Sequence, residues 1–344
     1  RGGERVDPVM LTRDEIIDLL STKDEAIVKA LLLHADQVRK EHVGEAVHLR
    51  GLIEFSNHCR RDCLYCGLRR SNRKLVRYRM SIPEIFAQVI EARELGFRTV
   101  VLQSGEDPCY TAGELGSLIE RIKTELGLAV TLSIGERPYG DYRILKDAGA
   151  DRYLLRFETS DPLLFKTLKP DSDYGDRFRC LGWLKELGYQ VGSGNMVGLP
   201  GQTWGSLADD ILEFKDMDLD MIGLGPYIAH PDTPLRGKPN GTIDLVLRVT
   251  ALTRIITKTV HMPATTATGT IDPEGRQKAL QCGANVLMPN LTPLKYRELY
   301  TIYPDKICIG EEPKMCRFCV EGMVASLGRT VARDEGHSLK RRPG

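Results

Sequence analysis

Three cysteines lie close together in the stretch CRRDCLYCGL, residues 59–68, on a Cx3Cx2C spacing. Thiolates are ligands of zinc and of iron–sulfur clusters, and both usually take four protein ligands. Here no further cysteine follows nearby, and His58 is the only near candidate for a fourth ligand. Three interpretations stay open: a zinc site completed by His58, a redox pair at Cys63 and Cys66, or a cubic 4Fe–4S cluster held by Cys59, Cys63 and Cys66 with one open iron.

A second group of three cysteines lies near the C-terminus in CIGEEPKMCRFC, at Cys308, Cys316 and Cys319. It is compatible with zinc, with an accessory iron–sulfur cluster of the 2Fe–2S or 4Fe–4S type, or with no metal, and we favour the accessory cluster. The remaining cysteines fall in predicted loops or helices, where we expect small, packed hydrophobic side chains: Cys109, Cys180 and Cys282.

Composition narrows the class of protein. The 344 residues include 48 basic and 47 acidic side chains, a net charge of +1, which argues against a general nucleic-acid or anionic-membrane binder. No apolar run approaches the roughly 18 residues of a membrane span, and the first residues lack the apolar stretch of a signal peptide. Nine cysteines, an odd number, without an export signal suggest reduced thiols, so we expect a cytoplasmic protein.

Short apolar segments alternate with amphipathic helical ones from about residue 48, which is typical of a parallel α/β sheet. Eight strands are predicted at 48–56, 99–105, 129–135, 152–159, 190–198, 221–228, 263–269 and 285–290. Eight such units predict a complete (β/α)8 TIM-type barrel over residues 48–304, with a doubly wound open sheet as the alternative. We expect a helical extension over 1–47 and a cysteine-containing C-terminal segment over 305–344.

In such a barrel the first cysteine group follows strand one, at the end where barrel active sites are built. Side chains two apart on a strand share a face, so Arg156 and Glu158 point together, as do Thr131 and Ser133. Inward charges are costly unless they are paired or bind a ligand. Arg156 and Glu158 therefore form either a structural ion pair or part of a polar site.

The cysteine spacing, with Tyr65 before the last cysteine, resembles the radical S-adenosylmethionine (SAM) superfamily. The resemblance implies that the open iron binds the amino and carboxylate groups of SAM. Reduction of SAM by the cluster then yields a 5′-deoxyadenosyl radical. The segment Gln103–Asp107 is similar to the family's Gly-Gly-Glu element, which binds the SAM ammonium, although Ser104 replaces the first glycine. An ordinary βα turn is the alternative for this segment.

The same resemblance assigns roles to further residues. The residues implied to bind SAM are Tyr65, Gln103, Ser104, Gly105, Glu106, Ser133, Glu158, Arg177 and Met221. The residues implied to line the cavity where the radical acts are Thr131, Arg156, Thr265, Thr266, Met288 and Tyr303. Several of these roles have a structural alternative. Arg177 would be a surface arginine, the threonines would be β-branched strand residues without a role in the site, and Met221 would be a residue of the hydrophobic core. Thr265 and Thr266 are adjacent on predicted strand seven, so both face inward only if the strand bulges.

Longer motifs, among them LQSGEDP (102–108), MVGLPGQT (196–203) and PATTATGTI (263–271), resemble the HydE family of FeFe-hydrogenase maturases. That family stands in one branch with biotin synthase and methylornithine synthase. The resemblance implies assembly of the hydrogenase di-iron centre from a small sulfur-containing, cysteine-derived iron carbonyl cyanide species. It also implies a ferredoxin- or flavodoxin-type reductant and the partner maturases HydF and HydG. The alternatives are a methylornithine-synthase-like or biotin-synthase-like enzyme acting on a small amino-acid-type substrate, and a non-catalytic iron–sulfur carrier.

Overall fold

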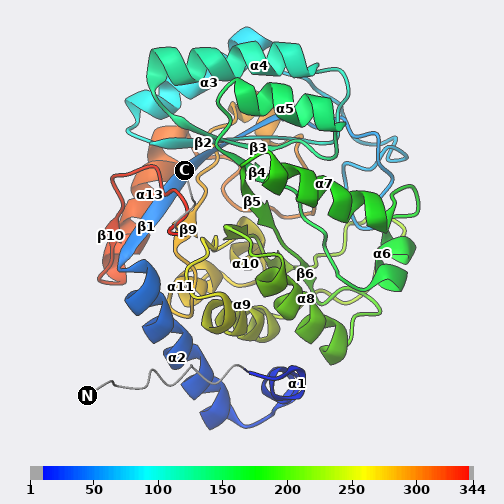
Figure 1. The fold of residues 1–344 in the computed structure, drawn as a ribbon, viewed down its shortest axis with the longest axis vertical. Helices are drawn as coiled ribbons and strands as arrows, with labels where there is room; N and C mark the ends of the chain where they lie inside the picture. The colour runs from blue at the N-terminus through cyan, green and yellow to red at the C-terminus, as the bar shows by residue number, and fades with distance from the viewer. Residues whose placement is uncertain (1–10, 341–344) are drawn as a thin grey trace.

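Two helices precede the central sheet. The computed structural model describes residues 11–340. Helix α1 (Arg13–Ser21) begins after Thr12, whose hydroxyl accepts from the N–H of Glu15 while the Glu15 carboxylate accepts from the N–H of Thr12. Helix α2 (Glu25–Val43) is capped by the carboxylate of Asp24. They pack against α8 (Trp204–Asp216) and α9 (Ile243–Thr257), respectively, at the lower end of Figure 1.

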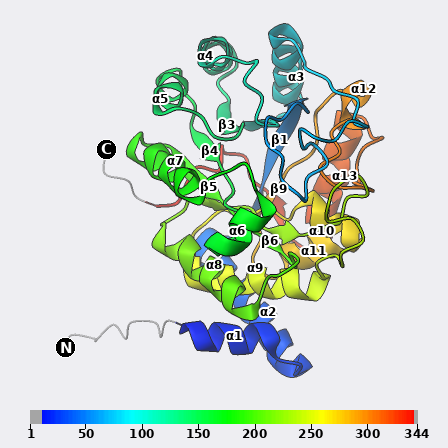
Figure 2. The same cartoon turned by 90° about the vertical axis from the view of Figure 1, so that its right-hand side faces the viewer.

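A curled parallel sheet forms the centre of the molecule, as Figures 1 and 2 show. Its strands run in the order β10-β1-β2-β3-β4-β5-β7, and β9 also pairs with β1. Their bounds are β1 (Ala46–Ser56), β2 (Thr99–Ser104), β3 (Ala129–Ser133), β4 (Arg152–Leu154), β5 (Gln190–Ser193), β7 (Met221–Ile222), β9 (Val286–Leu287) and β10 (Thr330–Val331). β6 (Met196–Val197) and β8 (Gly225–Pro226) form a separate parallel pair. The parallel α/β architecture predicted from the alternating pattern is confirmed.

The complete regular barrel of the prediction is overstated. In the sheet, no regular strand of the described residues fills the position between β7 and β9; single bridges join Met221 to His261 and Pro263 to Val286. The predicted seventh strand, 263–269, is wrong over its second half, because α10 (Thr266–Ile271) begins there. The hydroxyl of Thr265 accepts from the N–H of Thr268, and this cap starts a helix where β-branched residues favoured a strand.

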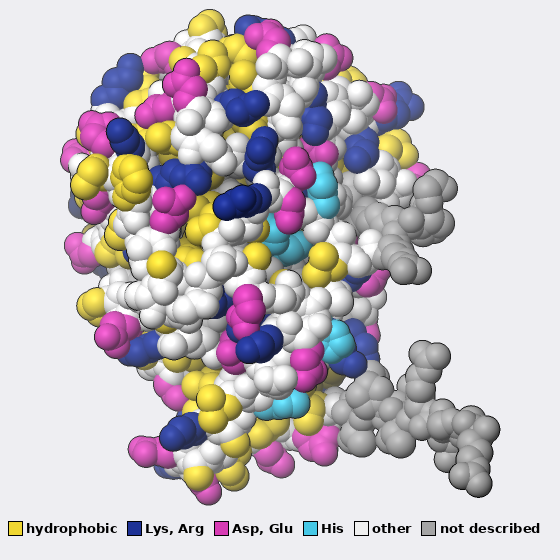
Figure 3. All heavy atoms as spheres, turned by 90° about the vertical axis from the view of Figure 1, so that its left-hand side faces the viewer, with side chains coloured by type: hydrophobic (Ala, Val, Ile, Leu, Met, Phe, Trp, Pro, Cys, Tyr) yellow, Lys and Arg dark blue, Asp and Glu magenta, His cyan; other side chains and the backbone are white. Residues whose placement is uncertain are grey.

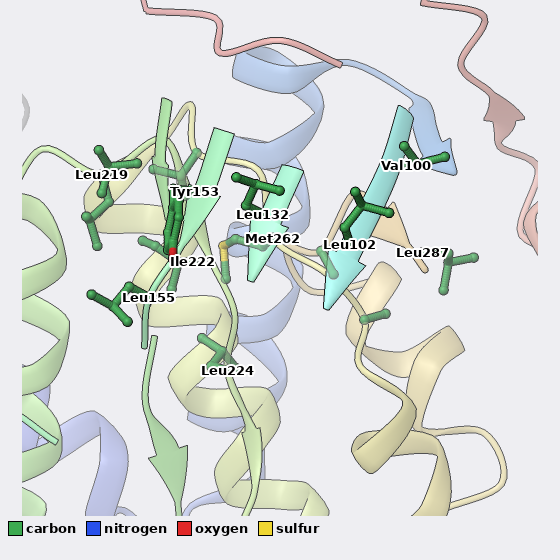
Figure 4. Close-up of a cluster of buried hydrophobic side chains, with 14 of the residues drawn as sticks. Val100, Leu102, Leu132, Tyr153, Leu155, Leu219, Ile222, Leu224, Met262 and Leu287 are labelled. Atoms are coloured by element: carbon green, nitrogen blue, oxygen red, sulfur yellow. The ribbon is translucent and has the colours of Figure 1, made fainter. Parts of the chain in front are cut away.

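Helices cover the outer face of the sheet (Figures 1 and 2). Their bounds are α3 (Ile82–Glu94), α4 (Ala112–Arg121) with a π turn over Ile122–Leu126, α5 (Tyr139–Asp147), α6 (Pro162–Leu168), α7 (Tyr174–Glu186), α11 (Gly275–Leu280), α12 (Leu294–Arg297) and α13 (Pro313–Ser326). Strand side chains such as Leu102, Leu132 and Tyr153 lie in one buried apolar cluster beneath them (Figure 4). No helix within residues 11–340 is long and apolar enough to cross a membrane.

The C-terminal residues close the barrel at the end where its strands begin. After β10 the chain crosses this end, and the carbonyl of Glu335 accepts from Arg152 Nη2 at 2.6 Å. The carbonyl of Gly336 accepts from Arg50 Nη2 at 3.1 Å, and both arginines are buried. Buried guanidinium groups need acceptors, and backbone carbonyls of the tail supply them. The cysteine loop follows β1 and lies at the opposite end of the barrel, which these tail contacts do not reach and which we call the open end. The predicted boundaries at residues 47 and 304 stay a prediction.

Candidate active site

The cysteine loop occupies residues 57–79, directly after β1, and lies on the side of the barrel turned to the viewer in Figure 2. Buried Asn57 fixes both ends of the loop, because its Nδ2 donates to the carbonyls of Val76 and Leu299 at 2.8 Å. The guanidinium of Arg77 donates to loop carbonyls, including that of Leu68 at 2.9 Å. The loop is therefore held by its own polar contacts, and its cysteines keep a defined arrangement.

All three thiols of the loop are free and half-buried. Burial raises the pKa of Cys59, and burial together with the other two thiols raises the pKa of Cys66. Such mutual repulsion of thiolates disappears when a cation or cluster binds them. The N–H of Glu106 lies 3.4 Å from Cys59 Sγ as a hydrogen-bond donor. These features suit thiolates that carry negative charge in a bound metal centre.

The donor set fits an iron–sulfur cluster better than zinc. Within residues 11–340, no three His, Cys, Asp or Glu side chains converge as the ligands of a single metal ion do. In a cubic cluster each thiolate binds a different iron, so its ligands stay farther apart. A cubic cluster with one open iron needs only the three thiolates of the loop, so His58 is not required as a fourth ligand.

The end of β2 lies directly on the cysteine loop. A Cβ added to Gly105 would lie 2.1 Å from the carbonyl oxygen of His58, which leaves room for glycine alone. The N–H of Arg60 donates to the carbonyl of Glu106 at 2.9 Å. Ser104 Oγ donates to the carbonyl of Gly105 at 2.6 Å, and half-buried Gln103 lies on the same strand end. The structure thus brings the predicted segment Gln103–Glu106 to the first cysteine.

A network of ion pairs joins the cysteine loop to the segments that follow β2 and β3 and to α7. Arg60 and Arg61 both contact Glu106 Oε1, at 2.6 and 2.8 Å. Arg61 also pairs with Glu136, and Arg177 Nε lies 2.6 Å from the other oxygen of Glu136. Burial lowers the pKa of Arg177, but Glu136 and Glu106 more than offset it. Arg177 and Glu106 were predicted as site residues from the sequence, whereas Arg61 and Glu136 were not. The pair of arginines that follows Cys59 was the one feature of the sequence that could have indicated Arg61.

Arg156 and Glu158 lie together, as their spacing predicted, although β4 itself ends at Leu154. Arg156 Nη2 lies 3.1 Å from Glu158 Oε2, and Arg177 Nη1 donates to the carbonyl of Arg156 at 3.1 Å. Glu158 adopts a positive φ of 71°, a strained conformation for a side-chain-bearing residue. Arg156 Nε and Asn195 Oδ1 are buried without a hydrogen-bond partner among the described residues. Unpartnered polar atoms beside the cysteine loop fit a polar ligand such as SAM.

Several other predicted residues keep partial exposure: Ser133, Thr265, Thr266, Met288 and Tyr303. Thr265 and Thr266 are not strand residues, because Thr265 caps α10 and Thr266 is its first residue. Burial raises the pKa of Tyr303, whose hydroxyl is hydrogen-bonded to Thr270. Tyr65 packs beside a small apolar cluster of Leu164, Leu168, Leu199 and Tyr227.

Two predicted site residues contact arginines of the barrel interior. Thr131 Oγ1 accepts from Arg152 Nη1 at 3.5 Å, and Met221 Sδ lies 2.8 Å from Arg50 Nη1. These are the arginines to which the C-terminal tail supplies acceptors. The expectation that Met221 packs near the SAM adenine, and Thr131 in the same cavity, stays a prediction. The alternation of side chains along a strand predicts which residues face the barrel interior. It does not predict how far along the barrel axis each of them lies.

The second cysteine group is less regular than the first. Cys316 is buried and Cys319 is exposed, three residues apart on α13, and Cys308 has a positive φ of 62°. A hydrogen bond from the Cys316 thiol lowers the pKa of Cys308. Of the remaining cysteines, Cys180 and Cys282 are buried as predicted. Cys109 is exposed, so its expected packing is wrong: it follows β2 in a surface loop.

The fold and the three-cysteine loop together define a radical SAM enzyme. A sequence model described as the Radical SAM superfamily matches residues 53–214. The chain is 50% identical to the FeFe hydrogenase maturase subunit HydE of Thermotoga maritima over 333 residues, which cover 97% of this chain and 95% of that protein. The chain therefore belongs to the radical SAM superfamily and, within it, to the HydE family. Membership implies a 4Fe–4S cluster and SAM as its cofactors.

More distant relatives agree with this assignment. The chain is 29% identical to 3-methylornithine synthase of Methanosarcina acetivorans, over 83% of this chain and 82% of that protein. A crystal structure of methylornithine synthase superposes with a TM-score of 0.81 at 24% identity, covering 94% of this chain and 95% of the other. That structural likeness confirms the barrel-type fold.

Proposed function

We propose that this enzyme reductively cleaves SAM and uses the resulting 5′-deoxyadenosyl radical in assembling the di-iron centre of FeFe hydrogenase. The proposal is carried by one observation: the three-thiol loop, the Gln103–Glu106 segment and the unpartnered polar atoms around Arg156 meet at the same open end of the barrel. The similarity to a hydrogenase maturase over 97% of the chain supports the substrate class.

In this proposal Cys59, Cys63 and Cys66 hold the 4Fe–4S cluster. When bound, the cluster supplies the electron that cleaves SAM. The chain's own residues bind and orient SAM: the backbone at Ser104 and Gly105 faces its ammonium, and Glu158 accepts hydrogen bonds from its ribose hydroxyls. Arg177 is fixed by Glu136 and offers charge to a carboxylate.

Further SAM contacts in the proposal come from Tyr65, Gln103, Glu106 and Ser133. The substrate cavity is proposed to be lined by Arg156, Thr265, Thr266, Met288 and Tyr303. The first of these carries the charge that suits a carboxylate or another anionic substrate group. A primary alkyl radical reacts with almost any neighbour, so its cavity has to exclude competing partners. The tail that covers Arg50 and Arg152 keeps the other end of the barrel closed.

The proposed substrate is a small sulfur-containing, cysteine-derived iron carbonyl cyanide species. The proposal extends to the partners expected from the family, namely a ferredoxin- or flavodoxin-type reductant and the maturases HydF and HydG. An amino-acid substrate of the methylornithine-synthase type is the second candidate, because the chain shares 29% identity with that enzyme. A second iron–sulfur cluster at Cys308, Cys316 and Cys319 is proposed as an accessory centre remote from SAM.

The test uses anaerobically reconstituted protein with dithionite and SAM. We expect 5′-deoxyadenosine to form, and its rate or partition to change when the iron–cysteine carbonyl cyanide species is added. Lysine added in its place should leave both unchanged. A response to lysine alone would favour the methylornithine-type enzyme, and complete absence of 5′-deoxyadenosine would favour a non-catalytic carrier.

A further inference from the structure

The cysteine loop is strongly basic. Residues 59–79 contain seven arginines and one lysine against a single acidic residue, Asp62, so eight minus one gives a net charge of +7. The whole chain carries a net charge of only +1. The rest of the chain therefore carries a net charge of −6 (+1 minus +7), so net positive charge is concentrated in the segment that holds the three cysteines.

Much of this charge lies at the surface. The exposed cations of the loop are Arg60, Arg70, Arg73, Lys74 and Arg79. Exposed Arg236, from the loop after β8, adds to them, since it lines a surface pocket of about 420 Å³ together with Arg69, Arg73 and Lys74. We call the five exposed loop cations and Arg236 the basic rim. It is built from two segments that are far apart in the chain.

Only half of the basic rim is neutralised. Arg60, Lys74 and Arg79 pair with Glu106, Asp232 and Asp107, at 2.6, 2.6 and 2.7 Å.

The other half has no such neutralisation. Within residues 11–340, Arg70, Arg73 and Arg236 form no ion pair with a carboxylate. On the face shown in Figure 3, by contrast, cations and carboxylates are interspersed. Three unpaired guanidinium groups beside paired ones create a local positive potential that acts on approaching charges.

We propose that the basic rim is the docking surface for a small acidic electron-carrier protein of the ferredoxin type. This inference rests on the proposed function, in which the cluster has to be reduced before SAM is cleaved. One electron leaves the carrier, which is oxidised, and enters the 4Fe–4S cluster, which is reduced; no atom or proton is exchanged.

Position and charge both support this partner. Arg60 follows Cys59 directly, and the three half-buried thiols belong to the same loop as five of the six rim cations. A carrier seated on the basic rim therefore contacts the loop that carries the proposed cluster ligands. Transient electron-transfer complexes have small interfaces, below about 1,200 Å², and depend on charge complementarity for their association rate. A short basic loop of this kind is sufficient for such an encounter.

The test compares two triple variants of the reconstituted full chain. R70E/R73E/R236E reverses the three unpaired cations of the basic rim. K23E/K29E/R143E makes the same change of charge at exposed positions on α2, before α2 and on α5. Two readouts are taken with an acidic 2(4Fe–4S) ferredoxin at low ionic strength: the Kd of the complex, and the rate of SAM cleavage driven by the reduced ferredoxin. Dithionite-driven cleavage is measured in parallel.

We expect the rim variant to bind the ferredoxin at least about tenfold more weakly and to lose a similar factor in ferredoxin-driven cleavage. Its dithionite-driven rate should stay within about twofold of the parent, and the control variant should match the parent in every readout. The difference should shrink as salt rises, because screening shortens the range of the attraction. R70K/R73K/R236K should retain binding, since it keeps the charge.

An unchanged Kd in the rim variant would overturn the inference, as would equal weakening by the control variant. Loss of binding in the lysine variant would also overturn it, because shape rather than charge would then be recognised. If the proposed function is wrong, the parent protein will form no 5′-deoxyadenosine with dithionite. The Kd values of the parent and the two triple variants would still show whether the ferredoxin binds at the basic rim.

Discussion

The backbone N–H of Glu106 donates a hydrogen bond to Cys59 Sγ over 3.4 Å. This contact joins the end of β2 to the first cysteine of the cysteine loop. It places the segment proposed to bind the SAM ammonium against the proposed cluster ligands. The close approach depends on Gly105, whose Cα faces the carbonyl oxygen of His58.

Gly105→Ala should disrupt the junction between β2 and the cysteine loop. A methyl group there would meet the His58 carbonyl oxygen at 2.1 Å, and the loop or the strand end would have to move. We expect a loss of roughly 1–3 kcal/mol of stability and at least tenfold slower SAM cleavage. Thermal melting and 5′-deoxyadenosine assays measure the two effects. Gly113→Ala is the matched control, since a Cβ there meets nothing within 4 Å; equal behaviour of the two variants would contradict the prediction.

Glu158→Gly should stabilise the fold while weakening SAM binding. The φ of 71° at Glu158 costs a side-chain-bearing residue of order 1 kcal/mol, which glycine avoids. The variant also loses the carboxylate that we place on the SAM ribose. We expect Tm to rise or stay level and the Kd for SAM to increase by about tenfold or more. Glu158→Gln keeps the strain and removes only the charge, so its Tm should not rise. A lower Tm for the glycine variant, with unchanged SAM affinity, would count against this role.

Removal of residues 335–344 should destabilise the barrel at the end remote from SAM. Arg152 and Arg50 lose the carbonyls of Glu335 and Gly336 as acceptors. A buried donor that loses its acceptor costs about 1–3 kcal/mol, and more when the donor is charged. Denaturant unfolding of the truncated chain measures the loss. Additional replacement of Arg50 and Arg152 by methionine should recover part of the stability, and no recovery would contradict the proposed cause.

Cys316→Ala should leave most SAM cleavage intact, because we propose that Cys308, Cys316 and Cys319, on and before α13, hold an accessory cluster that does not bind SAM. Iron and sulfide content should fall by the share of the accessory cluster, with less than about a threefold change in 5′-deoxyadenosine formation. Electron paramagnetic resonance of the reduced protein distinguishes the two centres. Abolished cleavage in this variant would show that the second cysteine group is coupled to the first.

Local patterns predicted a large part of the fold and site. The order of strands and helices followed from alternating apolar segments, and the cysteine spacing identified the loop. The prediction of the seventh strand is wrong over its second half. The hydroxyl of Thr265 caps a helix there, although the β-branched residues favour a strand. The contacts of Thr131 and Met221 with Arg152 and Arg50 could not be predicted either. The tail of the chain supplies acceptors to these two arginines from more than 180 residues away.

The ion pairs of the active site could not be predicted from the sequence either, because their partners are far apart in the chain. Arg61 and Glu136 are 75 residues apart, and Arg177 reaches the same carboxylate from α7. Nothing in the local sequence of Glu136 indicates these partners. The exposed position of Cys109 depended in the same way on where a loop leaves the sheet.

The most direct test of the account is 5′-deoxyadenosine formation by reconstituted protein with SAM and dithionite, compared with Cys63→Ala under identical conditions. We predict that the parent protein forms the product and that the variant forms none above background, since two thiolates do not hold the cluster that binds SAM. Equal product from both proteins, or none from the parent with its cluster intact, would contradict the assignment of the cysteine loop as the SAM-cleaving centre.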